Sequence, residues 1–302
     1  MKAPAKLAER LRELGNGFNL PEVQALYAPL LAAQPTGGVR VQADLRYGEH
    51  ARHALDVYVP AAAVPTTSLR PVLVAFHGGG FIRGDKAAKA NAGWCFAREG
   101  LVTVVPNYRL APESHWPSGP EDVAAVVRWL RAHAAEYGGD PDRIVLMGES
   151  AGAAHVAAAV LMRRFGVDRA AGVRGAILLS GPYHARLERL ARRAFSIATP
   201  DPRNDAYFGT DDADALAAAS IALQIDAAPL PLLVAHAERD LPQMTVQAGE
   251  LFARLVAAHD FAPEWLVVPD HNHFSSTIAL NTGDSSLSAP VLAFVGRHVE
   301  PH

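Results

Sequence analysis

The sequence contains a single cysteine, Cys95, among 302 residues. One cysteine excludes an intramolecular disulfide, so the fold has to be held together by its core. Neither sign of charge is in marked excess, because 28 Lys and Arg residues stand against 31 Asp and Glu residues, a net charge of −3. This balance gives no support for nucleic acid or another polyanion as a partner.

Long apolar runs are also absent, and no stretch reaches the roughly 20 apolar residues that a membrane-spanning helix needs. The first residues, MKAPAKLAERLREL, mix charged and apolar side chains at helical spacing, unlike the uninterrupted apolar stretch of a signal peptide. We therefore expect a soluble, cytoplasmic protein. Hydrophobic residues make up 50% of the chain, which is enough for the core of one large α/β domain spanning residues 1–302.

Short apolar, β-rich runs recur along the chain. They cover residues 39–48, 53–60, 71–78, 101–109, 143–150, 173–181, 231–238 and 264–269. From the third run onward, most are separated by helical patterns, at 86–99, 119–137, 151–165, 243–258 and 286–299. This alternation predicts a mostly parallel eight-stranded sheet with helices on both faces, and the closely spaced first two runs predict an antiparallel hairpin at its edge.

Two segments stand outside this alternation, and we expect them to form a small cap. Residues 1 to about 38 favour one or two short amphipathic helices, and residues 182–228 show no strand pattern. Within the second segment, HARLERLARRAF predicts a helix with Leu187, Leu190 and Ala194 on one side. The other side carries three arginines, Arg186, Arg189 and Arg193. A solvated face is the favoured interpretation of these arginines, and contact with an acidic substrate group is the alternative.

The strand pattern at 143–150 stops at Gly148-Glu149-Ser150-Ala151-Gly152 and passes directly into an alanine-rich helical pattern. A sharp strand-to-helix turn of this kind lifts a serine hydroxyl above the carboxyl edge of a sheet, and the two glycines let strand and helix pass close together. The serine then sits at a helix N-terminus, where free N–H groups stabilise negative charge. The pattern alone is weak, but its context favours Ser150 as a nucleophile.

A serine nucleophile needs a base and an orienting acid, which follow it along the chain in this type of fold. The seventh strand pattern runs into Asp240, and the eighth runs into His271 and His273. All these groups are expected at the same edge of the sheet. Asp240 is favoured over Glu238 as the acid because Glu238 still belongs to the strand, while both histidines remain candidates for the base.

The third strand pattern is followed by HGGGF at 77–81. Three consecutive glycines let the backbone approach a reacting carbonyl with its N–H groups exposed, as the oxyanion of ester hydrolysis requires. We assign the donors to the backbone amides of Gly79, Gly80 and Ala151. His77 is expected to brace the loop through a hydrogen bond.

These residues resemble a known family, the carboxylesterases of the hormone-sensitive-lipase-like group. The resemblance rests on HGGGF, on NYRLAPE at 107–113, on GGDPDRI at 138–144 and on GESAGA at 148–153, and it runs from about residue 40 to the C-terminus. It implies the α/β-hydrolase fold, serine esterase chemistry, no metal and no organic cofactor, and it is compatible with a homodimer. It also supports Ser150, Asp240 and His273 as a catalytic triad, with the three amides above as the oxyanion hole.

Two departures from that group concern the substrate. Its members usually have aspartate where Glu149 stands, and their acid and histidine motifs differ from RDLPQM and HNHF in this chain. HNHF looks more like the kynurenine-formamidase-like and feruloyl-esterase-like branch of the same superfamily. In that pattern the second histidine is catalytic, which favours His273 over His271.

Five aromatic residues are candidates for the substrate pocket, although core packing explains each of them equally well. They are Phe81, Trp94, Trp116, Tyr183 and Phe208. The leading functional hypothesis is a serine hydrolase for small-molecule esters with short-chain or aryl groups, acting through an acyl-enzyme. The alternatives are an arylformamidase-type amide hydrolase and a non-catalytic ligand-binding protein of the same fold.

Overall fold

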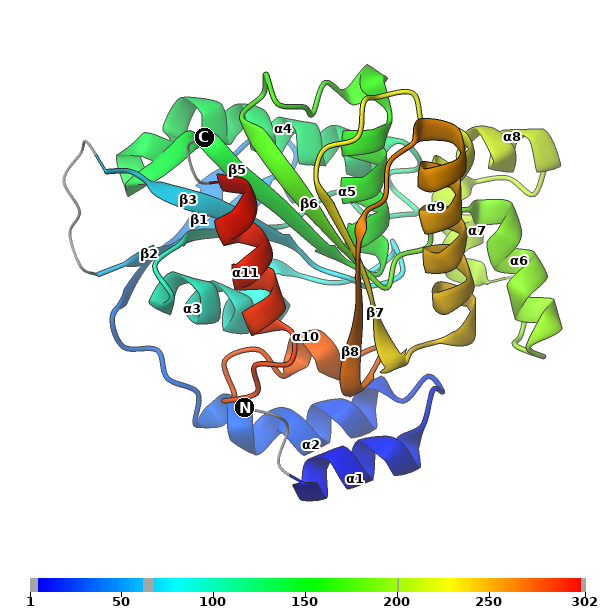
Figure 1. The fold of residues 1–302 in the computed structure, drawn as a ribbon, viewed down its shortest axis with the longest axis horizontal. Helices are drawn as coiled ribbons and strands as arrows, with labels where there is room; N and C mark the ends of the chain where they lie inside the picture. The colour runs from blue at the N-terminus through cyan, green and yellow to red at the C-terminus, as the bar shows by residue number, and fades with distance from the viewer. Residues whose placement is uncertain (1–4, 62–67, 200, 300–302) are drawn as a thin grey trace.

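The computed structural model describes residues 5–61, 68–199 and 201–299, and its centre is one eight-stranded sheet (Figure 1). The strands are β1 (Val39–Arg46), β2 (Ala54–Pro60), β3 (Arg70–Phe76), β4 (Val102–Pro106), β5 (Gly139–Glu149), β6 (Val173–Leu179), β7 (Leu232–Arg239) and β8 (Glu264–Asn272). They lie in the order β1-β2-β4-β3-β5-β6-β7-β8. β2 is antiparallel to β1 and β4, and all other pairs are parallel. The predicted mostly parallel sheet with an antiparallel edge is confirmed.

Helices pack on both faces of this sheet because the buried strands carry apolar side chains in both directions. On β3, Val72 and Val74 face one layer of the core, while Leu73 and Ala75 face the other. The first layer is covered by α4 (Ser118–His133), α5 (Ala151–Leu161) and α9 (Pro242–His259). The second is covered by α3 (Ala90–Arg98) and α11 (Ser288–Val299).

The register of the parallel strands brings their carboxyl ends to one edge. Glu149 at the end of β5 pairs with Leu179 at the end of β6, and Leu179 pairs with Ala235 of β7. Arg239 of β7 then pairs with Asn272 of β8. The residues that follow these strands therefore gather at one edge, as the strand pattern predicts.

The N-terminal segment forms two helices below this edge in the view of Figure 1, α1 (Ala5–Leu14) and α2 (Leu20–Ala32). Residues 1–4 of the expected cap lie outside the described residues. Leu11, Val23 and Tyr27 form a small apolar cluster with Phe274, which directly follows His273. The short helix α10 (Ser275–Ile278) contacts α2 as well as β8. The N-terminal helices are thus anchored next to the candidate base.

The described residues of 182–228, from which residue 200 is missing, contain no strand, and three α-helices follow one another there. They are α6 (Ala185–Ala194), α7 (Pro202–Phe208) and α8 (Ala213–Ala218). A short 3-10 helix, η4 (Ile221–Leu223), follows them before β7. Elsewhere in the described chain are the 3-10 helices η1 (Lys86–Lys89), η2 (Ala134–Tyr137) and η3 (Arg163–Phe165).

The predicted helix is present as α6, and its buried side is partly charged. Leu190 is 45% exposed, whereas Glu188 and Arg192 are buried and form an ion pair. Arg192 also pairs with Asp201, which precedes α7. These charged groups can be buried because Glu188 also accepts a hydrogen bond from Gln247 of α9 and Arg192 reaches Asp201.

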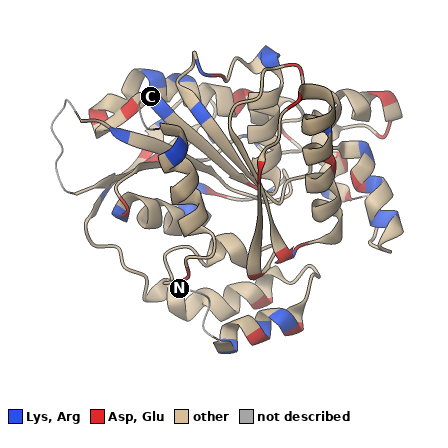
Figure 2. Cartoon of the chain, in the orientation of Figure 1, with Lys and Arg blue, Asp and Glu red and all other residues tan. Residues whose placement is uncertain are grey.

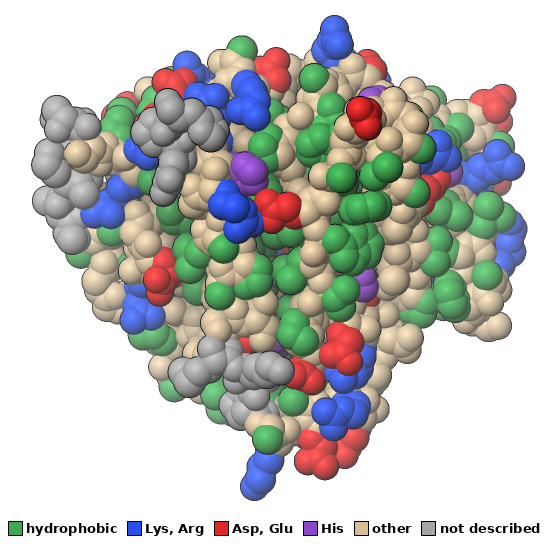
Figure 3. Space-filling view, viewed as in Figure 1, with side chains coloured by type: hydrophobic (Ala, Val, Ile, Leu, Met, Phe, Trp, Pro, Cys, Tyr) green, Lys and Arg blue, Asp and Glu red, His purple; other side chains and the backbone are tan. Residues whose placement is uncertain are grey.

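Charged side chains lie mainly on the outer helices and loops, whereas the central strands carry few of them (Figure 2). On the face shown in Figure 3, basic, acidic and hydrophobic side chains are interspersed, and no single sign of charge dominates. Within the described ranges, no helix combines the length and the apolar character needed to cross a bilayer.

The core layer under α11 gives a test of the fold. Phe294 of α11 has no exposed surface, and a Cβ added to Gly175 of β6 would lie 3.0 Å from its ring. Phe294→Ala should lower the free energy of unfolding by about 3–5 kcal/mol, because burial is lost and a cavity remains. Urea unfolding followed by far-UV circular dichroism measures this change. Leu190→Ala, on the exposed side of α6, is the control and should cost about 0.5 kcal/mol or less; equal losses would contradict the packing described.

Candidate active site

Ser150 occupies a sharp turn between β5 and α5, at the carboxyl edge of the sheet. Its φ of 53° and ψ of −120° lie in a region that residues other than glycine rarely adopt. Its N–H donates to the carbonyl oxygen of Leu179 at 2.9 Å, and its own carbonyl accepts from the N–H of Ala154 at 3.1 Å. The neighbouring strand and the first turn of α5 therefore hold the serine in this strained conformation.

The glycines on either side of Ser150 are required by close backbone contacts. A Cβ added to Gly148 would lie 2.4 Å from the carbonyl oxygen of Gly152. One added to Gly152 would lie 2.5 Å from the carbonyl oxygen of His77. Both distances are far shorter than any tolerated carbon–oxygen contact, so no side chain fits at either position. β5, α5 and the loop after β3 can approach one another only because both residues are glycine.

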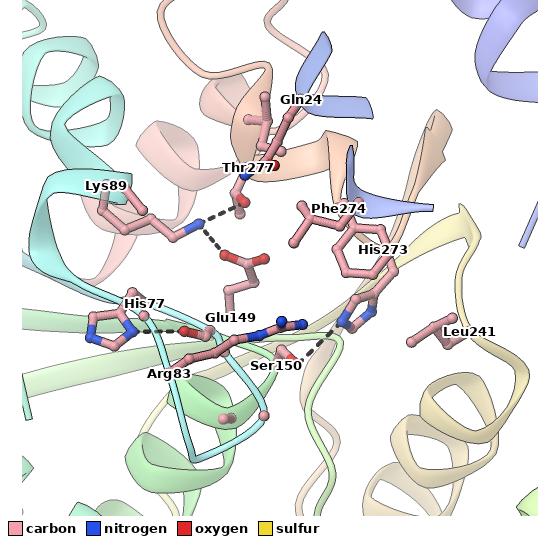
Figure 4. Close-up of a pocket in the computed structure, with 18 of the residues that line it drawn as sticks. Gln24, His77, Arg83, Lys89, Glu149, Ser150, Leu241, His273, Phe274 and Thr277 are labelled. Carbon is pink, nitrogen blue, oxygen red and sulfur yellow. Dashed lines mark hydrogen bonds and ion pairs between the residues drawn. The ribbon is translucent and has the colours of Figure 1, made fainter. Parts of the chain in front are cut away.

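His273 follows β8, and its ring lies between Ser150 and Asp240. Its Nε2 atom is 3.2 Å from Ser150 Oγ (Figure 4), and its Nδ1 atom is 2.7 Å from Asp240 Oδ1. Asp240 and His273 are 3% and 4% exposed, so bulk water does not compete for this contact. The structure thus brings together one residue from each of three strand ends.

Asp240 is held by four hydrogen bonds. Besides that from His273, Oδ1 accepts one from the N–H of Leu241 at 2.8 Å, while Oδ2 accepts from the Ser180 hydroxyl and from the N–H of Ala237. Burial alone would raise the pKa of Asp240, but the charge of His273 and these hydrogen bonds hold that pKa below its usual value. Burial alone would lower the pKa of His273, but the Asp240 carboxylate more than offsets this and raises it.

The two rejected candidates lie elsewhere. Glu238 is exposed, pairs with Arg239 and accepts a hydrogen bond from the N–H of Asp270. His271 is fully buried, with Nδ1 2.9 Å from Ser275 Oγ and Nε2 3.2 Å from an Asp284 carboxylate oxygen. The geometry therefore unites Ser150 with His273 and Asp240, whereas His271 braces the loop that carries His273.

The loop after β3 borders Ser150. Gly79 has a φ of 136°, Gly80 has a φ of 60°, and a Cβ on Gly79 would lie 1.9 Å from the carbonyl oxygen of Arg83. In the described part of the chain, the backbone N–H groups of Gly79, Gly80 and Ala151 have no acceptor, and all three residues border one cavity with Ser150. These three N–H groups can therefore donate hydrogen bonds to an oxygen atom of a ligand bound in the cavity.

His77 is packed into the base of that loop. Its ring stacks on Tyr108 with centroids 4.2 Å apart, and its carbonyl oxygen accepts a hydrogen bond from the Tyr108 hydroxyl at 2.8 Å. Burial lowers the pKa of His77 to about 4, so the ring is neutral at neutral pH. A neutral, stacked ring agrees with the predicted bracing role.

The cavity over Ser150 has a volume of about 580 Å³, within the usual size range for small-molecule sites. Its apolar wall includes Phe18, Leu20, Ala28, Leu31, Met244 and Phe274. Phe81 borders it as predicted, but the other four aromatic candidates do not. Tyr183 is 1% exposed with its hydroxyl accepting from the N–H of Gly181, and Phe208 packs behind Phe81 with centroids 6.0 Å apart.

A buried ion pair on the cavity wall was missed from the sequence. The Lys89 ammonium contacts the Glu149 carboxylate and donates to Thr277 Oγ1 at 2.7 Å (Figure 4). Burial alone would raise the pKa of Glu149, but the charge of Lys89 holds that pKa below its usual value. The sequence did contain a hint of this ion pair, because Lys89 follows the glycine loop closely and Glu149 directly precedes Ser150. Thr277 had no local signal.

Among the described residues, no group of three or more His, Cys, Asp or Glu side chains is arranged to hold a metal ion.

Curated relatives share part of this chain. A carboxylesterase of Mycobacterium tuberculosis is 45% identical over 87 residues, which cover 27% of this chain and 26% of that protein. A probable isoprenylcysteine alpha-carbonyl methylesterase of Arabidopsis thaliana is 35% identical over 124 residues, which cover 41% of this chain and 25% of that protein. The chain therefore spans about a quarter of the length of these relatives.

Solved structures resemble the chain over nearly its whole length. A bacterial heroin esterase has a TM-score of 0.73 and 26% sequence identity, and the match covers 99% of this chain and 98% of that one. A family model described as alpha/beta hydrolase fold matches residues 73–275, which hold the glycine loop, the serine turn and the histidine. Because this match covers more than half of the sequence, the chain belongs to the alpha/beta hydrolase fold family.

Proposed function

We propose that this protein hydrolyses carboxylic esters, with Ser150 as nucleophile, His273 as general base and Asp240 as the acid that orients it. The observation that carries the proposal is the His273 ring between Ser150 Oγ and Asp240, inside a cavity of small-molecule size. The relatives named above are esterases, which supports the ester class over formamides. The assembled triad also argues against a purely ligand-binding protein.

In the first step, Ser150 Oγ attacks the ester carbonyl while its proton passes to His273 Nε2. The hydrogen bond from His273 Nδ1 to Asp240 keeps Nε2 free to accept that proton, and the carboxylate stabilises the imidazolium. The four hydrogen bonds on Asp240 keep it ionised in a buried place. The imidazolium then protonates the leaving alkoxide, and the acyl group remains on Ser150.

The tetrahedral intermediate places negative charge on the former carbonyl oxygen. The unpaired N–H groups of Gly79, Gly80 and Ala151 are the donors in our proposal, and each such donor stabilises the transition state by about 3–4 kcal/mol in related chemistry. In the second half, His273 takes a proton from water as the water attacks the acyl-enzyme, which gives a second tetrahedral intermediate with its oxyanion at the same donors. This intermediate collapses by breaking the bond to Ser150 Oγ, which takes the proton back from His273. Release of the acid regenerates Ser150.

The two helical segments frame the opening of the cavity. Leu20 and Leu31 of α2 border it from one side, and Arg203 and Asn204 of α7 border it from the other. We take these segments as the small cap of a single domain. A mostly apolar cavity of about 580 Å³ has the size of a small-molecule site, and short-chain or aryl esters are the class that we propose for it.

Replacing the nucleophile is the direct test. Ser150→Ala should lower kcat/KM for p-nitrophenyl butyrate by at least about 10³-fold, because no acyl-enzyme forms. The control is Ser276→Ala, since Ser276 is buried with an unpaired hydroxyl but lies outside the cavity wall, and this variant should retain activity. Stopped-flow or steady-state absorbance of p-nitrophenol gives the rates. A Ser150→Ala protein that remains as active as wild type would exclude this mechanism.

The same assay defines the substrate class. On the proposed short-chain preference, wild type should hydrolyse p-nitrophenyl acetate and butyrate with higher kcat/KM than octanoate and laurate. N-formylkynurenine serves as the formamide comparator. Cleavage of the formamide with no activity on any ester would replace the ester proposal with the amidase alternative.

The triad also predicts a pH dependence. Only neutral His273 accepts the proton, and Asp240 raises the pKa of His273, so kcat/KM should fall as the pH drops through that raised value. Asp240→Asn should lower the rate by about 10³–10⁴-fold and move the acid limb to lower pH, because the carboxylate charge is removed. Profiles of kcat/KM between about pH 5 and pH 9 measure both effects. Glu238→Gln is the matched control and should change neither the rate nor the position of the acid limb. If the acid limb of Asp240→Asn stays where it is in wild type, Asp240 is not the acid that acts on His273.

A further inference from the structure

Two arginines flank an aromatic ring that borders the cavity. The guanidinium carbons of Arg83 and Arg203 lie 5.8 Å and 5.1 Å from the centroid of the Phe18 ring. Phe18 makes an edge contact with Phe274 at 4.9 Å, and Phe274 makes one with His273 at 5.0 Å. Two ring contacts, Phe18 with Phe274 and Phe274 with His273, therefore connect the site of both guanidinium groups to the proposed base.

Both arginines are also attached to the proposed oxyanion loop. The N–H of Arg83 donates to the carbonyl oxygen of Gly79 at 3.2 Å, which closes the loop on itself. A Cβ added to Gly80 would lie 2.7 Å from Cδ of Arg203, so the stem of that side chain packs on the loop. Figure 4 shows the Arg83 side chain extending across the cavity toward Ser150 and His273.

Each carboxylate on the cavity wall already has a cation. Glu149 pairs with Lys89, and Asp201 pairs with Arg203. Glu188, the third carboxylate there, pairs with Arg192, which also contacts Asp201.

Arg83 is the cation left over. It borders the same cavity, yet no carboxylate in the described ranges forms an ion pair with it. The cavity therefore presents one unmatched positive charge beside the reacting centre. A planar guanidinium donor is well suited to a carboxylate, which it can bind through two parallel hydrogen bonds.

The arginines of α6 do not compete for this role. Arg186, Arg189 and Arg193 lie outside the cavity wall, and Arg189 pairs with Asp205. The alternative that they contact an acidic substrate group therefore has no support from the geometry. Arg193 is exposed and serves as a matched control for loss of one positive charge.

We propose that Arg83, with Arg203 beside it, binds a carboxylate of the substrate and makes the protein selective for esters that carry such a group. This inference rests on the proposed ester hydrolysis and adds a substrate class to it. The carboxylate is part of either the acyl or the alcohol portion of the ester, and the two arms of the experiment distinguish these sources.

The experiment compares matched acidic and neutral esters in a pH-stat at about pH 8, where the carboxylates are ionised. The acyl arm uses monomethyl adipate against methyl hexanoate. The alcohol arm uses 4-acetoxybenzoate against 4-acetylphenyl acetate. In each arm the measured quantity is the ratio of kcat/KM for the acidic ester to that for the neutral one, in wild type, Arg83→Gln, Arg83→Lys and Arg193→Gln.

In at least one arm, Arg83→Gln should lower this ratio by about 5-fold, because a charge-assisted hydrogen bond is lost at an exposed side chain. Arg83→Lys should retain only part of the ratio, because the charge remains but the two parallel hydrogen bonds are lost. Arg193→Gln should leave the ratio unchanged. High salt should reduce the wild-type ratio, because exposed charges are screened. A purely structural role for Arg83 would lower kcat/KM for both esters equally.

A ratio that Arg83→Gln leaves within about twofold of wild type in both arms would overturn the carboxylate site. If wild type then still hydrolyses the neutral esters and Ser150→Ala does not, ester hydrolysis stands and the carboxylate site alone fails. If wild type hydrolyses none of the four esters, both proposals fail together.

Discussion

The close passage of β5, α5 and the loop after β3 at Ser150 is the constraint on which the rest of the site depends. Neither Gly148 nor Gly152 leaves room for a Cβ, and α5 is composed of small and apolar residues apart from His155, all of them buried. A helix packed so tightly on the sheet directs its first N–H groups at the turn. The strained backbone of Ser150 is stable only because hydrogen bonds from β6 and α5 secure it. The packing of the core around this turn therefore determines where the Ser150 hydroxyl lies.

The buried charges around this turn form matched pairs. Asp240 with His273 and Glu149 with Lys89 each place a carboxylate beside a cation or a potential cation, because an unpaired charge at such depth would be strongly destabilising. The two pairs also interact, since the Glu149 carboxylate contributes to raising the pKa of His273. Replacement of the usual aspartate by Glu149 therefore keeps a negative charge near the proposed base, with Lys89 as its partner.

Features that depend on sequence order were predictable, and features that depend on distant contacts were not. The strand and helix alternation places Ser150, Asp240 and His273 after three parallel strands, and parallel strands end at one edge whatever the details of packing. The burial of Glu188 and Arg192 on α6 could not be predicted, because their partners Gln247 and Asp201 lie outside the helix. Phe18 likewise has no local signal, because its role comes from rings and cations far away in the chain.

Electrostatics links the proposed recognition of an acidic ester to the proposed chemistry. The charge of Arg203 lowers the pKa of His273, whereas Asp240 and Glu149 raise it, so the base responds to the whole set of charges around the cavity. A substrate carboxylate at Arg83 would add a negative charge to this set and would favour the imidazolium that forms as Ser150 attacks. Arg83 would stabilise the bound ester, and the negative charge of the ester would stabilise the His273 imidazolium during the reaction. On this view, selectivity arises from transition-state stabilisation as well as from affinity.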